Sequence, residues 1–513
     1  MFRTKHAVAI ALQIVILLAP LTARSAPLMS PPIKVGEYGD NPDLAYNYNS
    51  NQYIVVWTTG TQGLRGRFVR AGWTMGNEFE ITSVANQSDG SPRVAFDPSR
   101  MRYLVVWNRG GYGGHMYGRF IPWNGPDPNL TEFIIGPNVA VYAEAEYSVA
   151  YSTTQDEFFV VWVTKYTTPE TYFPTVARRV RADGGGFLGN TFFIANHPPD
   201  NRSHPDVAYN LARNEYLVAT HDYPKVNDNI YGVRVTGTGA VQSEFTIAGW
   251  PDDEAMPAVA ASPTADQYLV VWDSIRPSSL ERGVYARFVS GNGTPGDVKE
   301  IVYWGPDYYD KEEIFPEVAW GITDSTLDAP RYLVVYMNQY GNELRAREVF
   351  PDGTMFDNFL ISDFTSTRHA VAGGRINHLV TWTGAGIYAS FVGNTVPKSC
   401  FSVEPAQGYS NTDFLFDASC SADATQPESK LQVRWDWNGD DIYETNWSYT
   451  KTISHRFTFP PGQSKSVFTV KMQITDGKGE TDTTTKDVIV LHSAETAEDF
   501  PWELFLPAIL KKK

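Results

Sequence analysis

The sequence contains few of the residues on which common enzyme sites depend. Of 513 residues only 2 are cysteine and 9 are histidine, and charged residues make up 19%. No HExxH, GxSxG or CxxC pattern occurs, which argues against the usual zinc-protease, serine-hydrolase and thiol-redox sites. With 42% hydrophobic residues the chain can build proper cores, and its length allows more than one domain.

The chain has fewer basic than acidic residues, with 42 Lys and Arg against 58 Asp and Glu. The formal net charge is -16, and such a field repels nucleic-acid backbones and anionic membrane surfaces. We therefore expect no nucleic acid among the partners. The aromatic share of 14%, with 41 glycines and 33 prolines, favours short strands and tight turns over long helices.

Residues 1–25 have the features of a secretory signal peptide. Arg3 and Lys5 supply a positive start, residues 7–21 are apolar, and small residues precede Ala26. A membrane anchor is the weaker interpretation, because the apolar run is short and is interrupted by a glutamine and a proline. No later stretch is long and apolar enough to span a bilayer. We expect an exported protein of bacterial type, secreted or at the cell surface, with no membrane span in the mature chain.

One apolar word recurs along the chain. YLVVW occurs at 103–107 and again at 268–272, and near-copies occur at 53–57, 158–162 and 332–336. Each copy follows a short element that contains a small residue. Weaker versions of the word, YLVAT at 216–220 and HLVTW at 378–382, follow two more such elements. Alanines mark the seven elements: Ala45, Ala95, Ala150, Ala208, Ala260, Ala319 and Ala372. Their spacing of 50 to 59 residues implies one supersecondary unit per repeat.

Two further apolar elements follow each word, so that a repeat supplies four short strands separated by turn residues. This pattern is typical of β-propeller blades, and a right-handed solenoid is the alternative. The seventh repeat lacks its fourth strand, whereas Ile33–Val35 precedes the first repeat. Pairing Ile33–Val35 with Ile387–Val392 would close the ring and remove the exposed edges. We predict an all-β chain whose residues 31–396 form a seven-bladed β-propeller closed in this way.

An arginine follows the small residue of the third strand in five repeats. Such arginines could form a functional basic ring, or they could donate hydrogen bonds to carbonyl groups between blades. We favour the second interpretation. The arginines concerned are Arg67, Arg119, Arg178, Arg287 and Arg347.

The pattern changes at Pro397, and both cysteines lie beyond it. In an exported chain Cys400 and Cys420 are expected to form a disulfide rather than a metal or redox site. Alternating apolar runs downstream suit a small antiparallel sandwich. We assign residues 397–492 to this second domain and residues 493–513 to a C-terminal tail.

The second domain resembles a PKD domain, an immunoglobulin-like module of many exported bacterial proteins and some animal proteins. The motifs that carry the resemblance are FDASCSAD (416–423), WDWNGDD (435–441), HRF (455–457) and ITDGKG (474–479). The family favours W-D-F-G-D-G in the second motif, where this chain has Asp441 in place of a glycine. The resemblance implies a non-catalytic spacer or contact domain. The final residues, FLPAILKKK, are similar to short ends of some exported bacterial proteins that serve in export or surface attachment, and their role here stays open.

The WDWNGDD motif also has part of the spacing of a calcium-binding loop. Asp436, Asn438 and Asp440 alternate, with Glu444 at the ninth place, and oxygen ligands of this kind suit Ca²⁺. The glycine expected at the sixth place is absent. We keep Ca²⁺ at the first three residues as a hypothesis beside the simpler one, in which their side chains cap a hairpin turn. No other cofactor is expected.

The predicted binding surface is the propeller face that carries the loops between fourth and first strands and between second and third strands. Aromatic and acidic residues gather in these loops, and they suit sugar stacking with hydroxyl hydrogen bonds as well as a protein contact. We predict an exported, monomeric binding or adhesion protein that presents this face to a glycan or a protein. The candidate binding residues are Trp250, Asp252, Asp253, Trp304, Tyr308, Tyr309, His221 and Tyr223.

An enzyme is the alternative. A propeller glycoside hydrolase or polysaccharide lyase would draw carboxylates from different blades into the central cavity. Four acids near the starts of inner strands are the candidates, and for each a solvated turn position is the simpler interpretation. These acids are Asp43, Asp206, Asp253 and Glu317.

Overall fold

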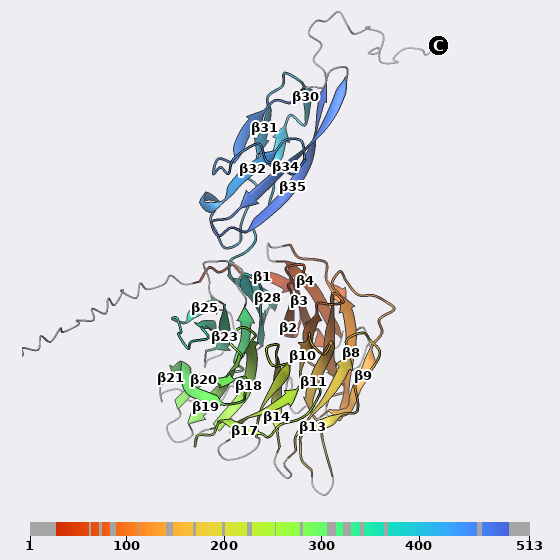
Figure 1. The fold of residues 1–513 in the computed structure, drawn as a ribbon, viewed down its shortest axis with the longest axis vertical. Coiled ribbons are helices and arrows are strands. Elements are labelled where there is room, and N and C mark those ends of the chain that lie inside the picture. Colours follow the sequence, from red (N-terminus) through yellow and green to blue (C-terminus); the bar gives the residue numbers. More distant parts are fainter. Residues whose placement is uncertain are drawn as a thin grey trace, which may run out of the picture.

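A computed structural model shows the fold of the protein (Figure 1). The predicted signal peptide and C-terminal tail lie outside the described residues. In the described part of the chain no helix is long and apolar enough to cross a membrane. The structure describes residues 27–491 except 61–62, 71–73, 83–88, 112, 140–146, 168–170, 197–200, 223–227, 252, 277–280, 305–313, 322–329, 339–342, 364–367 and 459–463.

The first part of the chain forms four-stranded antiparallel sheets that are the blades of a β-propeller. In blades one to six the strands follow chain order from the innermost to the outermost. Blade one contains β2 (Asp40–Asn47), β3 (Gln52–Thr58), β4 (Leu64–Arg70) and β5 (Phe79–Glu80). Blade two contains β6 (Arg93–Asp97), β7 (Arg102–Arg109), β8 (Gly114–Pro122) and β9 (Phe133–Val139). Blade three contains β10 (Tyr147–Ser152), β11 (Glu157–Val163), β12 (Thr175–Arg181) and β13 (Phe192–Ala195).

The next three blades repeat this order. Blade four contains β14 (Ser203–Asn210), β15 (Glu215–His221), β16 (Ile230–Thr236) and β17 (Phe245–Ala248). Blade five contains β18 (Asp253–Ser262), β19 (Gln267–Arg276), β20 (Glu281–Ser290) and β21 (Pro295–Trp304). Blade six contains β22 (Glu317–Gly321), β23 (Arg331–Met337), β24 (Leu344–Val349) and β25 (Phe359–Ser362).

The ring is closed by strands from the two ends of the propeller segment. β1 (Ile33–Gly36) pairs antiparallel with β28 (Gly386–Gly393), with Ile33 opposite Ala389. Blade seven therefore has the order β1-β28-β27-β26, where β27 is Asn377–Gly384 and β26 is His369–Gly373. Each inner strand contacts the inner strand of the next blade, and β26 contacts β2. The predicted closure and the predicted number of blades are confirmed.

The recurring apolar word forms the second strand of each blade. The tryptophans that end the word in β3, β7 and β19, Trp57, Trp107 and Trp272, are fully buried. Both faces of such a strand are covered by the neighbouring blades, so every residue in it can be apolar. The third strand is crowded in the same way, because a Cβ atom added to Gly66 would lie 2.6 Å from the Phe79 ring.

The third-strand arginines join neighbouring blades, as predicted. Nη1 of Arg67 donates a hydrogen bond of 2.7 Å to the carbonyl oxygen of Val35 in β1, and Arg347 donates one of 2.6 Å to Ile301 in β21. Charge-assisted hydrogen bonds of this kind are stronger than neutral ones. The other three arginines make the same contact: Arg119 with Ile81, Arg178 with Ile135 and Arg287 with Ile247.

The C-terminal part of the described chain is a two-sheet β-sandwich. Its aromatic core includes Phe416, Trp435 and Phe457. The predicted disulfide between Cys400 and Cys420 is present. One sheet has the order β29 (Ser402–Glu404), β31 (Phe414–Asp417), β33 (Thr452–His455). The other has the order β30 (Gln407–Tyr409), β35 (Thr481–Leu491), β34 (Lys465–Thr475), β32 (Gln432–Asp436), and a short 3-10 helix spans Glu428–Lys430.

The sandwich follows blade seven directly (Figure 1). Asn394, just beyond β28, donates a hydrogen bond of 2.6 Å from Nδ2 to Asp476, and Thr395 donates one of 2.9 Å to Asp423. The first and third strands of an antiparallel blade run in the same direction, so β28 ends on the propeller face opposite the one where inner strands begin. The sandwich is therefore attached at the end remote from the starts of the inner strands.

Replacing Val35 by aspartate should open the ring. Val35 is fully buried in a cluster with Trp57 and Ile387, and a carboxylate there has no cationic partner in that cluster, so we expect the free energy of unfolding to fall by about 3 kcal/mol or more. The measurement is chemical or thermal unfolding followed by tryptophan fluorescence. Lys34→Gln on the same strand is the control and should stay within about 0.5 kcal/mol of the wild type. Equal stability of V35D and the wild type would contradict the closure.

Candidate functional site

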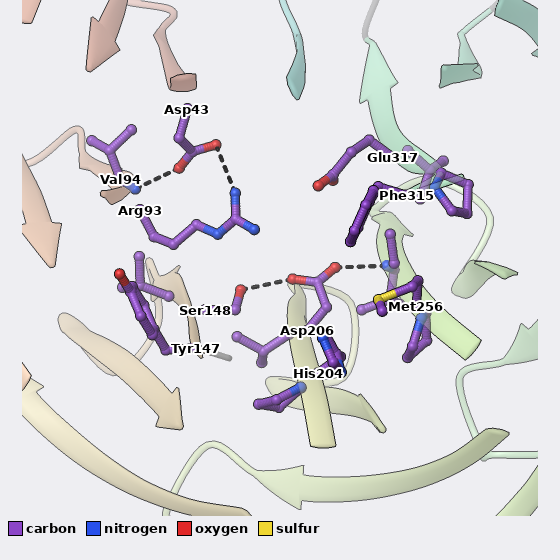
Figure 2. Close-up of a pocket in the computed structure, with 18 residues that line it drawn as sticks. Asp43, Arg93, Val94, Tyr147, Ser148, His204, Asp206, Met256, Phe315 and Glu317 are labelled. Carbon is purple, nitrogen blue, oxygen red and sulfur yellow. Dashed lines mark hydrogen bonds and ion pairs between the residues drawn. The ribbon is translucent and has the colours of Figure 1, made fainter. Parts of the chain in front are cut away.

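One position of the repeat lies at the propeller axis. In each repeat it stands two residues before the marker alanine, and its identity changes from blade to blade. The seven residues at this position are Asp43, Arg93, Ser148, Asp206, Ala258, Glu317 and Ala370. All of them except Ala370 line one central cavity of about 190 Å³ (Figure 2).

This axial cavity brings together three of the four acids predicted from the sequence. Asp43, Asp206 and Glu317 come from blades one, four and six and line it in common. Asp253 does not line it. Asp253 stands seven residues before its marker alanine, Ala260, whereas each of the other three acids stands two residues before its marker alanine. The strand β18 therefore carries Asp253 past the end of the cavity.

Two of the acids also link neighbouring inner strands. Oδ2 of Asp43 accepts a hydrogen bond of 2.7 Å from the backbone N–H of Val94, and Oδ2 of Asp206 accepts one of 2.7 Å from Val259. The hydroxyl of Ser148 donates to the other Asp206 oxygen at 2.7 Å. These two aspartates thus have a structural role between blades, whatever else they do.

Glu317 is different, because its carboxylate has no hydrogen-bond partner among the described residues. Burial raises its pKa to about 8; the positive charge of Arg93 opposes this effect, and the carboxylates of Asp206 and Asp43 add to it. Burial also raises the pKa of Asp43, to about 6, against the opposing influence of Arg93, whose Nη1 lies 4.0 Å from Oδ1 of Asp43. The pKa of Asp206 is raised by burial as well. The cavity therefore holds carboxyl groups that lose their protons at different pH values.

A bulge in front of a proline shapes three of the inner strands. Asn41, His204 and Met256 precede prolines and have φ values of 50°, 46° and 53°, and the pairing register shifts at this point. Left-handed φ values are uncommon outside glycine, and β-bulges re-aim side chains. As a result, residues on both sides of the proline line the cavity: His204 with Asp206, and Met256 with Ala258.

Arg93 and His204 are cavity residues that the sequence analysis does not identify. The guanidinium of Arg93 extends from blade two toward the carboxyl groups (Figure 2). The His204 ring stacks on His221, with centroids 4.9 Å apart, and burial lowers its pKa to about 4, which keeps the ring neutral at neutral pH. Alignment of the repeats on their marker alanines would have pointed to Arg93, because it shares the axial position with the acids.

Four of the eight predicted binding residues lie among the described residues: His221, Trp250, Asp253 and Trp304. His221 is 1% exposed and accepts a hydrogen bond from the Met256 N–H, so it supports the cavity wall and cannot meet a ligand at the surface as predicted. Trp250 packs edge-on against Tyr285, and Trp304 packs against Tyr336. Asp253 begins β18 and is partly exposed. The other four candidates lie outside the described residues: Asp252, Tyr308, Tyr309 and Tyr223.

The candidate calcium residues form a turn in the sandwich. Carboxylate oxygens of Asp436, Asp440 and Glu444 lie within 4.8 Å of one another. Asp436 already accepts hydrogen bonds from the backbone N–H groups of Asn438, Gly439 and Asp441 at 3.2, 2.7 and 2.9 Å. The capping role thus accounts for this turn, and a calcium ion there stays a prediction.

No family model matches the chain, and no curated protein matches it. The PKD resemblance therefore stays a resemblance, beside a sandwich fold that agrees with it. Among solved structures, the chain is similar to an ulvan lyase, a polysaccharide lyase, with a TM-score of 0.47 and 10% identity over 71% of this chain and 96% of the other.

Two other similar structures belong to carbohydrate-related proteins. An α-L-arabinanase of Penicillium chrysogenum complexed with arabinobiose has a TM-score of 0.38 and 12% identity over 60% of this chain and 93% of that one. A neuraminidase-like protein of A/little yellow-shouldered bat has a TM-score of 0.37 and 11% identity, with 60% and 92% covered. Similarity at this level carries no argument about activity or substrate.

Replacing Glu317 by glutamine should stabilise the protein at alkaline pH. The folded-state pKa of Glu317 is raised from 4.5 to about 8, so its contribution to stability is complete below pH 4.5 and is lost as the pH rises through 8. At pH 9 we expect the free energy of unfolding of E317Q to exceed that of the wild type by about 1–3 kcal/mol. At pH 4 we expect the two free energies of unfolding to be nearly equal. Urea unfolding at both pH values measures this difference. The exposed Asp297 offers the control D297N, and a pH dependence of E317Q equal to that of the wild type would contradict the burial of this carboxyl.

Proposed function

We propose that the chain is an exported glycoside hydrolase that cleaves a polysaccharide or oligosaccharide in the axial cavity. The observation that supports this proposal is the carboxyl group of Glu317, which lines a cavity, has no hydrogen-bond partner among the described residues and has a pKa of about 8. A glycosidase needs one carboxylic acid that keeps its proton near neutral pH and a second carboxyl group that has lost it.

In the proposed reaction Glu317 is the general acid. It gives its proton to the glycosidic oxygen while the bond between that oxygen and the anomeric carbon breaks. Asp43, with its pKa of about 6 and Arg93 beside it, is ionised above that pH. In one route Asp43 attacks the anomeric carbon, and water then breaks the resulting ester bond while Glu317 takes a proton from that water. In the other route Asp43 takes a proton from a water that attacks the anomeric carbon directly. In both routes water supplies the hydrogen and the hydroxyl group added to the two products.

Asp206 has a positioning role in this scheme. Both of its carboxylate oxygens accept hydrogen bonds, one from Ser148 and one from the Val259 N–H, so it is held in place at the cavity wall. Its negative charge is among the influences that raise the pKa of Glu317. The volume of about 190 Å³ is below the usual range for drug-sized ligands of about 300–1,000 Å³, which suits a single sugar unit entering end on.

A binding or adhesion protein without turnover is the second candidate. This candidate is favoured by the hydrogen bonds that the N–H groups of Val94 and Val259 donate to the two aspartates. Because these bonds link neighbouring inner strands, they account for Asp43 and Asp206 without a catalytic role. In either case the sandwich, attached at the face remote from the starts of the inner strands, would act as a spacer. The two candidates differ only in whether a bound glycan is cleaved.

Cleavage should be detectable on a panel of polysaccharides and oligosaccharides. We expect the mature protein to release reducing ends from at least one of them, with kcat/KM highest near pH 7 and falling below pH 6, where Asp43 gains a proton, and above pH 8, where Glu317 loses one. E317Q should lower kcat/KM by about 10²–10⁴-fold. NMR of the fresh product then distinguishes retention from inversion.

Asp253→Asn is the matched control, because Asp253 does not line the cavity, and it should leave kcat/KM unchanged. Glycan binding by the wild type and E317Q alike, with no cleavage of any substrate, would favour the second candidate. Full activity in E317Q would contradict the proposed role of Glu317.

A further inference from the structure

A second cavity lies between blades two and three and shares no lining residue with the axial cavity. Its volume is about 370 Å³. Phe120 and Phe133 of blade two and Phe187 of blade three supply apolar walls, and Arg102 and the turn residue Gly184 complete them. Arg181 and Asp183 of blade three also line the cavity, and they pair with each other. The cavity therefore combines aromatic surface with this ion pair and with the guanidinium of Arg102.

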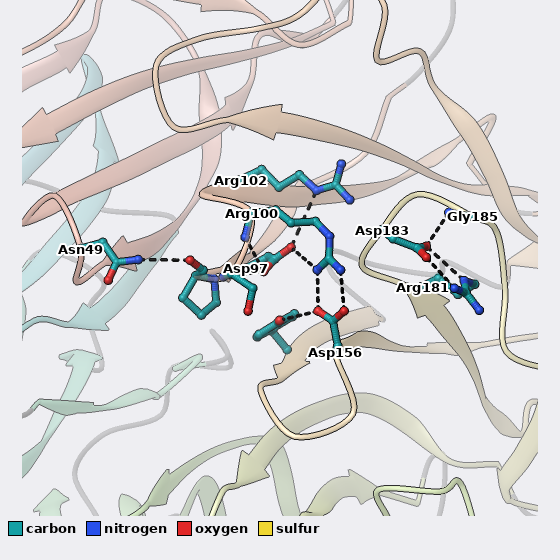
Figure 3. Close-up of polar contacts among 11 residues, drawn as sticks. Asn49, Asp97, Arg100, Arg102, Asp156, Arg181, Asp183 and Gly185 are labelled. Atoms are coloured by element: carbon teal, nitrogen blue, oxygen red, sulfur yellow. Dashed lines mark hydrogen bonds and ion pairs between the residues drawn. The ribbon is translucent and has the colours of Figure 1, made fainter.

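The guanidinium of Arg102 makes no hydrogen bond in the described part of the chain. Its Nε and Nη2 atoms are buried and have no hydrogen-bond partner, although the side chain is 12% exposed. The nearest carboxylate oxygen, on Asp97, is 3.8 Å from Nε, and the single dashed line that reaches Arg102 in Figure 3 marks this long ion pair. The guanidinium carbon lies 4.2 Å from the centre of the Phe120 ring. A buried guanidinium with unfilled donors is costly and calls for an explanation.

The charged neighbours of Arg102 are occupied with one another (Figure 3). Arg100 makes two hydrogen bonds to the Asp156 carboxylate, of 2.5 and 2.6 Å, and Arg181 pairs with Asp183 at 2.5 Å. Asp97 accepts hydrogen bonds from the backbone N–H of Ser99 and of Arg100. The Asp97 carboxylate is shared between Arg100, whose Nη1 donates to it at 3.3 Å, and Arg102, whose ion pair with it is the long one of 3.8 Å.

The same strand position in other blades has a partner. It is the first residue of the second strand. We call facing the third-strand residue that stands diagonally from it, two positions before its direct partner in the sheet. Three blades place an ion pair there: Glu157 with Arg179 at 2.7 Å, Glu215 with Arg234 at 2.9 Å and Arg331 with Glu348 at 2.6 Å. In blade two the facing residue is Phe120, which cannot neutralise Arg102.

Blades one and five also have a phenylalanine at the facing position. Their second strand begins with a glutamine instead of an arginine, and the glutamine side chain has a hydrogen-bond partner. Gln52 donates from Nε2 to the backbone oxygen of Trp123 at 2.9 Å, and Gln267 donates to Pro351 at 3.0 Å. Both acceptors belong to the turn after the third strand of the next blade. Blade two alone among these combines the phenylalanine with an arginine. A cavity lies beside the turn in blade two and also, with about 540 Å³, at the equivalent place in blade one, where Gln52 lines it. The arginine is therefore what distinguishes the cavity of blade two.

We propose that this cavity binds a carboxylate or sulfate group carried by a sugar, with Arg102 as the residue that holds the anion. The guanidinium presents several N–H donors in a planar fork that matches the geometry of a carboxylate or sulfate. The phenylalanine walls suit the apolar face of a sugar ring. This site is independent of the axial cavity and of the reaction proposed there.

Arg102→Gln is the decisive variant, because it gives blade two the arrangement that blades one and five already have. The probes are glucuronate and a sulfated glucose, with glucose as the uncharged control and sodium chloride at equal ionic strength. For the wild type we expect a concentration-dependent rise in melting temperature with one or both anions, and none with glucose. In R102Q the dissociation constant measured by calorimetry should rise by about 30-fold or more, with the melting temperature in ligand-free buffer unchanged or higher.

Arg213→Gln is the control for loss of a positive charge, since Arg213 is a surface residue paired with Asp266. It should leave the response to the anions unchanged. A response to glucuronate alone or to the sulfated sugar alone identifies which group the site takes. Equal responses of R102Q and the wild type, or no response of the wild type to either anion, would overturn the proposal, whether or not the protein cleaves glycans.

Discussion

The pairing of β1 with β28 is the interaction on which the rest of the structure depends. It joins residues that are more than 300 positions apart in the chain, such as Ile33 and Ala389, and it gives the last blade its outer strand. With this strand in place every blade has four strands, and the ring leaves only the short outer edges of its blades unpaired. Closure also fixes where each inner strand begins, so that residues from blades one, two, four and six meet around a single cavity at the axis.

The repeat separates the residues that hold the ring together from those that can vary. The apolar word, the small third-strand residue and the arginine beside it recur because they pack blade on blade, and Arg67 ties blade one to the closing strand itself. The axial position two residues before the marker alanine faces open space instead. It can therefore hold aspartate, arginine, serine, alanine or glutamate without disturbing the packing.

Much of the fold follows from the sequence, because the features that set it are local and repeated. The strand order, the ring closure, the arginine contacts and the disulfide could all be predicted from periodicity and spacing. The site was predicted in part, since Asp43, Asp206 and Glu317 share one offset from their alanines and Asp253 does not. The bulge that brings His204 into the cavity was not predicted. A proline stands three residues before the marker alanine in each of the three bulged strands, but a proline alone does not specify how the pairing register shifts. The buried place of His221 depends on the same bulge.

Ring closure encloses the Glu317 carboxyl in the axial cavity beside other carboxyl groups, and this environment keeps its proton near neutral pH. The most direct test is an NMR titration of protein labelled with ¹³C at the glutamate carboxyl carbons, in which the E317Q spectrum identifies the Glu317 signal. We predict a midpoint near pH 8 for this signal. A midpoint near 4.5, the ordinary value for glutamate, would contradict it.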